Sequence, residues 1–96
     1  MDLAAFRASL ADAAPPAGLA PPLAALWWDA RGDWARAHTI VMGAEGAGAA
    51  WVHAYLHRKE GDRANAGYWY RAAGRTMPEG SLDAEWEAIA AALLGR

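Results

Sequence analysis

Residues 26–33, LWWDARGD, and residues 55–62, YLHRKEGD, end in the same glycine–aspartate pair, and the two pairs lie 29 positions apart. Glycine readily adopts the left-handed conformation that closes a helix, and aspartate caps the N-terminus of the next helix. Each pair therefore predicts a tight turn between two helices. Its recurrence predicts that one helix–turn–helix unit is used twice.

Proline, glycine and the spacing of apolar residues divide the rest of the chain. Asp2 is suited to cap a first helix, Pro15 comes after its expected end near residue 13, and Ser81 is suited to cap a last helix. The expected fold is a single all-α domain of about six helices, with two tandem antiparallel hairpins between capping helices. The expected ranges of the N-terminal helix, first hairpin, second hairpin and C-terminal helix are 1–14, 21–43, 49–75 and 81–95.

Composition supports the helical class. Apolar residues make up 55% of the 96 residues, and alanine, the best helix former, supplies many of them. Valine, isoleucine and threonine, which favour strands, are scarce. The length fits one domain, and we expect Trp34, Trp69 and Trp86 to lie on its core-facing helix seams.

Charge and residue usage exclude several classes of protein. The formal net charge of −2 does not provide the basic surface that nucleic-acid binding requires. The absence of cysteine excludes disulfides and thiolate metal sites. No apolar run is long enough to span a membrane, and charged residues interrupt the N-terminal stretch where a signal peptide would be apolar. We therefore expect a soluble, cytoplasmic chain with no nucleic-acid or membrane partner.

The second turn and the helix after it carry a family resemblance. Gly61, Asp62, Ala66, Tyr70, Ala73 and Pro78 are spaced as in the second half of a tetratricopeptide repeat, and Gly32, Ala37 and Val41 form a weaker copy. The likeness covers residues 22–78, although the first helices of the units depart from the family pattern and the spacing is shorter than the usual 34 residues. Residues 51–70 also resemble a run in a family of small, uncharacterised bacterial proteins, which implies no activity.

This resemblance implies a scaffold that binds a protein or peptide partner, or another copy of itself, rather than an enzyme. Two repeats are near the minimum for a stable stack, so helices at both ends must cap it. Clustered aromatic residues that cannot all face one core, and arginines near the second turn, are the candidate binding residues. These are Trp28, Trp51, Tyr55, Arg58, Tyr68 and Arg71.

The three histidines form a second candidate site. His53 and His57 are four residues apart, so they share a face of one helix, and Glu60 continues that face. His38 lies on the preceding helix, which is expected to pack alongside. Three imidazoles and a carboxylate can hold a divalent metal, the one cofactor that the sequence suggests, and can also do acid–base chemistry near neutral pH.

Other interpretations of the histidines stay open. The apolar arc of their helix, residues 51, 52, 55 and 56, leaves both histidines largely opposite the core, whereas the tetratricopeptide register buries them. Buried histidines would need hydrogen-bond partners, because an unpaired buried polar group costs about 1–3 kcal/mol. A structural role, a metal or ligand site, a small enzyme and a pH-dependent partner surface all remain compatible with the pattern. The candidate structural partners are Asp29, Asp33, Asn65 and Tyr68.

Overall fold

Both glycine–aspartate pairs form the turns that the sequence predicts. Gly32 and Gly61 have φ values of 86° and 90°, in the left-handed region that favours glycine. The N–H of the adjoining aspartate donates to the carbonyl five residues back, at 2.9 Å in both turns. The carboxylates of Asp33 and Asp62 accept from the N–H three residues further on, at 3.0 and 3.1 Å. The two turns are therefore built in the same way.

A computed structural model describes residues 1–95, and within them it contains six α-helices and no β-strand. The all-α class with six helices is confirmed. The helices are α1 (Leu3–Ser9), α2 (Pro21–Ala30), α3 (Trp34–Met42), α4 (Ala47–Glu60), α5 (Arg63–Ala72) and α6 (Leu82–Leu94).

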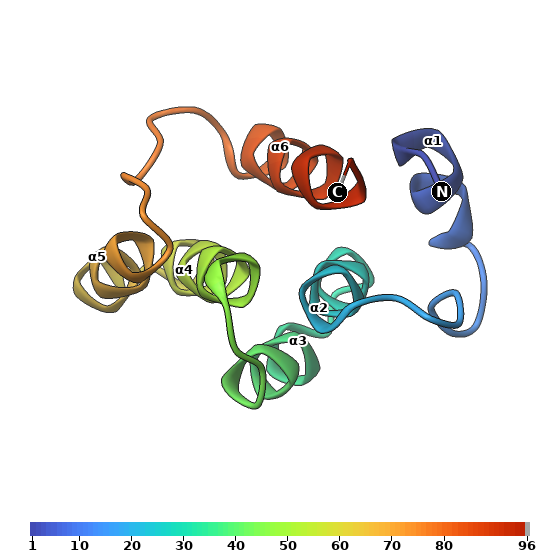
Figure 1. The fold of residues 1–96 in the computed structure, drawn as a ribbon, viewed down its shortest axis with the longest axis horizontal. Helices are drawn as coiled ribbons and strands as arrows, with labels where there is room; N and C mark the ends of the chain where they lie inside the picture. The colour runs from blue at the N-terminus through green and yellow to red at the C-terminus, as the bar shows by residue number, and fades with distance from the viewer. Residues whose placement is uncertain (96) are drawn as a thin grey trace.

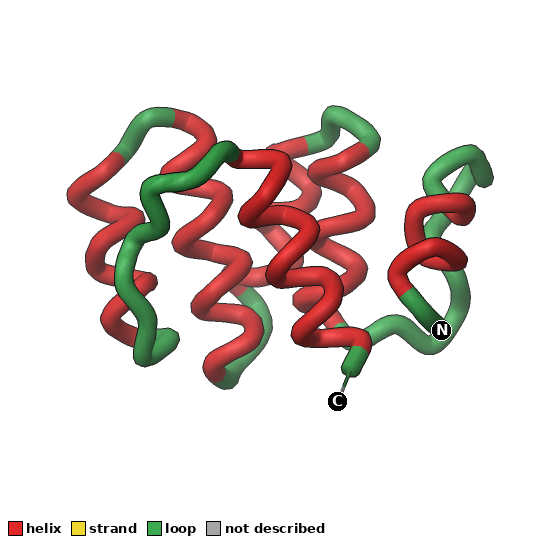
Figure 2. Tube along the Cα trace, turned by 90° about the horizontal axis from the view of Figure 1, so that it is seen from above, coloured by secondary structure: helices red, strands yellow, loops and turns green. Residues whose placement is uncertain are grey.

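Helix α4 occupies the centre of the fold. It packs against α5 and α3 on two sides and also contacts α2 and α6, while α2 packs along α3. The connection from α5 carries the chain back so that α6 lies against α4 and α2, and α1 packs on α6 (Figure 1). The helices of the two hairpins and α6 stand side by side, with the turns at their ends (Figure 2).

Neighbours on several sides bury the middle of α4. All ten residues over 48–57 are buried, including His53 and His57, which retain 5% and 6% of their surface. The helix therefore has no solvent-facing side in this stretch, which explains why its apolar residues do not form a single seam. The tetratricopeptide register predicts that both histidines are buried, as observed. The apolar arc formed by residues 51, 52, 55 and 56 predicts instead that they face away from the core, which is wrong.

The core collects residues from all six helices. Its largest fully buried side chains are Trp27, Tyr70, Phe6, Leu26, Leu56, Ile89 and Val52. Of the three tryptophans expected on core seams, Trp86 is buried, whereas Trp34 and Trp69 are half-buried. The rings of these two lie against histidines instead.

Helix α1 is shorter than expected, because it ends at Ser9 and not near residue 13. The Ser9 hydroxyl donates to the carbonyl of Phe6 and accepts from the indole N–H of Trp27. The next N–H groups bond three residues back, so the chain tightens into turns. The guanidinium of Arg31 donates to the carbonyls of Leu10 and Asp12. Contacts with Trp27 of α2 and with Arg31 after α2 thus take the place of a further helical turn at the end of α1.

Two buried carboxylates join helices across the core. Asp29 of α2 accepts from the hydroxyl of Tyr55 at 3.0 Å and pairs with the ammonium of Lys59 at 3.0 Å. Glu85 of α6 accepts from the hydroxyl of Tyr70 at 2.6 Å and pairs with the Arg58 guanidinium at 2.9 Å. Burial and the adjacent carboxylates raise the pKa of both phenols, which therefore remain hydrogen-bond donors.

Among the described helices, none combines the length and the apolar character that crossing a membrane would require.

Replacing Gly61 by alanine tests the turn. The left-handed φ at this position disfavours any side chain, although a Cβ would meet no atom within 4 Å. We expect Gly61→Ala to lower the free energy of unfolding by about 1 kcal/mol in urea denaturation. Gly80→Ala is the matched control, because Gly80 also has open space around it but no left-handed φ. Equal stabilities for the two variants would contradict the role of the left-handed glycine in the turn.

Candidate metal centre

Three histidines from two helices converge between α3 and α4. His38 lies in the middle of α3, and His53 and His57 lie one turn apart on α4. Each ring offers a nitrogen, and these three atoms all lie within 4.8 Å of one another. Nε2 of His38 and Nε2 of His53 lie 3.2 Å apart. The structure thus brings together the three imidazoles that the sequence singled out.

Half-buried tryptophans hold the imidazoles from both sides. The His38 ring stacks on Trp34, one turn earlier in α3, with centroids 4.8 Å apart. The His53 ring stacks on Trp69 of α5 at 4.0 Å. The Trp34 indole N–H in turn donates to the carbonyl of Leu56 in α4 at 2.8 Å. These contacts fix the ring planes, so the convergence does not depend on freely rotating side chains.

The sequence did not identify these two tryptophans as part of the site. The spacing of four between Trp34 and His38 is a local signal that could have indicated the first stack. The stack of Trp69 on His53 has no such signal, because it depends on how α5 packs against α4.

Glu60 sits behind His57. Its carboxylate Oε2 lies 2.6 Å from His57 Nδ1, and it does not join the group of three imidazoles. A carboxylate bonded to one ring nitrogen orients the ring and directs the other nitrogen, Nε2, to a ligand. Glu60, which the sequence suggests as a possible fourth metal ligand, therefore contacts His57 and lies outside the group of three imidazoles. His57, Glu60 and Asp62 form a second, more exposed group of donors.

The surroundings of His53 and His38 favour the uncharged form of these two imidazoles. Burial, together with the neighbouring His57 and His38, lowers the pKa of His53 to about 4. Burial and His57 also lower the pKa of His38, although Glu60 opposes this effect. Both rings are therefore unprotonated near neutral pH, which is the form that binds a metal ion.

The spacing of the ring nitrogens suits a transition metal. Two nitrogens bound tetrahedrally to zinc, at about 2.0–2.1 Å each, lie about 3.3 Å apart. The 3.2 Å between His38 and His53 is close to this value. The ligand nitrogen of His57 lies within 4.8 Å of the other two nitrogens. Imidazole ligands suit zinc, copper, nickel and iron, whereas calcium and magnesium require oxygen ligands.

The partners suggested for buried histidines lie elsewhere. Asp29 binds Tyr55 and Lys59, Asp33 caps α3, and Asn65 and Tyr68 are exposed. The histidines instead contact one another, Glu60 and the flanking indoles. The sequence could not reveal this, because the rotation of each helix about its axis decides which residues meet.

The six candidate peptide-binding residues do not share one surface. Tyr55 and Arg58 are engaged in the two buried carboxylate networks. Trp28 is half-buried, with the Arg36 guanidinium 4.1 Å above its ring, and Tyr68 is exposed on α5. Only Trp51 and Arg71 line the same cleft.

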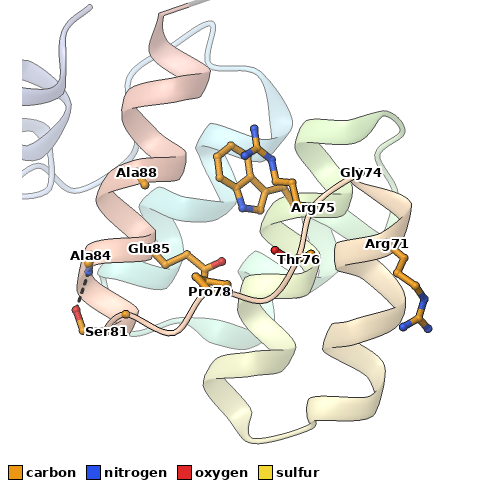
Figure 3. A pocket seen from close by; sticks show the side chains of 11 residues that line it. Arg71, Gly74, Arg75, Thr76, Pro78, Ser81, Ala84, Glu85 and Ala88 are labelled. Carbon is orange, nitrogen blue, oxygen red and sulfur yellow. Dashed lines mark hydrogen bonds between the residues drawn. The ribbon is translucent and has the colours of Figure 1, made fainter.

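That cleft has a volume of about 770 Å³ and lies between α4, α6 and the connection from α5 to α6. The Arg75 guanidinium lies over the Trp51 ring at 3.3 Å and so covers this buried indole. Glu85 reaches the cleft from α6, while Arg71 points away from α6 (Figure 3). The guanidinium groups of Arg71 and Arg75 therefore do not point to one place in the cleft.

No family model, curated protein or solved structure matches this chain. Its function must therefore be inferred from the arrangement of its own residues.

The lowered pKa of His53 predicts an acid-sensitive fold. The unfolded chain, with an ordinary histidine pKa of about 6.5, binds this proton more readily than the folded protein, so stability falls as pH drops from about 6.5 to about 4. Between about pH 7 and pH 4.5 we expect metal-free protein to lose about 2 kcal/mol more unfolding free energy than His53→Gln. Urea denaturation with a chelator present measures this difference.

Thr39→Ala is the control for that measurement. Thr39 is exposed on α3 next to His38, and its hydroxyl bonds only to the carbonyl of Ala35 in the same helix. This variant should retain the wild-type pH dependence. If His53→Gln also retains the wild-type pH dependence of the unfolding free energy, the acid sensitivity arises from groups other than His53.

Proposed function

We propose that this protein binds one divalent transition-metal ion through His38, His53 and His57. The observation that carries the proposal is the convergence of three imidazole nitrogens within 4.8 Å of one another. Three histidines from two packed helices form a ligand set found in zinc sites.

The surroundings of the imidazoles support metal binding. Stacking on Trp34 and Trp69 restricts the rings, which lowers the entropy lost when an ion is bound. The Glu60 carboxylate lies 2.6 Å from Nδ1 of His57, and a carboxylate at one ring nitrogen orients the imidazole so that the other nitrogen can bind a metal ion. These are the outer interactions that orient histidine ligands in metal sites.

The tetratricopeptide-like pattern of the sequence predicts a different function, the binding of a protein or peptide partner. Its candidate residues are dispersed over separate faces and internal networks, so the geometry favours metal binding over it. The histidines line none of the three described clefts, which are bounded by other residues. For this reason catalysis on a large substrate is not proposed.

Metal binding by protein purified without a polyhistidine tag tests the proposal. We expect one zinc, cobalt, nickel or copper ion per chain in calorimetric titration and elemental analysis, and a higher melting temperature on binding. His38→Asn and His53→Gln should each remove most of the affinity, while Thr39→Ala should bind as the wild type does. Circular dichroism of each variant establishes that it is folded. Failure of the wild-type protein to bind any of these ions would overturn the proposal.

Glu60→Gln separates a supporting carboxylate from a metal ligand. Removing an outer partner of a histidine ligand weakens metal affinity by about 10–100-fold. We expect this loss for Glu60→Gln with the stoichiometry unchanged, because the three imidazoles remain. Glu79→Gln, an exposed position in the connection between α5 and α6, is the control and should have no effect. An unchanged affinity for Glu60→Gln would show that the contact with His57 does not support binding.

A further inference from the structure

We propose that the bound metal keeps one coordination position open for a small exogenous ligand, occupied by water and exchangeable for a monodentate anion. This inference rests on the proposed metal site and concerns what that site does with its ion. A metal held by three protein nitrogens with a vacant fourth position is the arrangement of catalytic zinc sites, whereas structural sites are closed by four protein ligands.

The count of donors supports an open position. Among the described residues, the group of mutually close metal-binding side chains around His38 and His53 contains His57 and no fourth member. Glu60 is engaged at Nδ1 of His57, and Asp62 groups with those two residues and not with His38. No cysteine is present in the sequence. A four-coordinate ion would therefore take its last ligand from solvent.

Exposure indicates where that ligand enters. His53 and His57 are buried, whereas His38 on α3 is half-buried, so the side of α3 is the more exposed side of the cluster. The half-buried rings of Trp34 and Trp69 stand beside His38 and His53. Two of the three imidazoles are buried, so the site suits a ligand of a few atoms.

Charge favours an anion at this position. Three neutral imidazoles leave the full double positive charge of the ion in place. The Glu60 carboxylate contacts His57 and offsets only part of this charge. An ion with neutral ligands in a partly desolvated site binds anions strongly and acidifies its bound water. The chemistry of the position is thus that of water, hydroxide or a small anion such as azide.

Cobalt-loaded protein and azide provide the test, because the visible absorption of Co²⁺ reports its ligands directly. After one cobalt per chain is established, titration with sodium azide should change the visible spectrum saturably, with one azide per cobalt. Sodium perchlorate at equal ionic strength is the control and should cause no change. Dialysis after the titration should show that cobalt stays on the protein.

The possible outcomes separate the two proposals. Absence of stoichiometric cobalt binding contradicts the metal site itself. Stoichiometric cobalt with a spectrum that azide does not alter overturns the open position alone. An azide response that appears in Glu60→Gln but not in the wild type also overturns it, because Glu60 would then occupy the fourth position. A response in both proteins supports the inference.

Discussion

Burial of the middle of α4 on several sides is the constraint on which the other features depend. A helix surrounded by α2, α3, α5 and α6 must place every side chain against a neighbour, and in α4 ten consecutive residues are buried. Its polar residues cannot turn to solvent, so each requires a partner within the fold. Over the described residues no buried side-chain nitrogen or oxygen lacks a hydrogen-bond partner. The histidine cluster and the carboxylate networks are two consequences of this requirement.

The carboxylate networks show how α4 is tied to both ends of the fold. Asp29 binds side chains of α4 from α2, and Glu85 binds α4 and α5 from α6. In each case a tyrosine hydroxyl and a cation share one buried carboxylate, so the charge is paired and hydrogen-bonded. These contacts hold α2 and α6 against α4. They also occupy Tyr55 and Arg58, two of the residues that the sequence suggests for binding a partner.

The histidine cluster differs from these networks because it brings together three side chains of the same kind, with no opposite charge between them. Three imidazoles gather around one point, and burial lowers the pKa of His53 and of His38, so these two rings are uncharged near neutral pH. A hydrogen bond between two ring nitrogens satisfies His38 and His53 in the absence of an ion. A metal would replace that single bond by three coordinate bonds, while the stacked indoles keep the rings in place. The same packing thus serves both the fold and the proposed site.

The sequence by itself determined the helical class, the two glycine–aspartate turns, the helix caps and the pairing of His53 with His57 on one face. These features depend on residues within one or two helical turns of each other, where backbone preference and spacing decide. Only the tertiary structure decided that His38 meets the other two histidines, that Trp69 covers His53 and that Arg58 turns inward to Glu85. The physical reason is that contacts between helices depend on the rotation of each helix about its axis and on its neighbours, and the local sequence encodes neither.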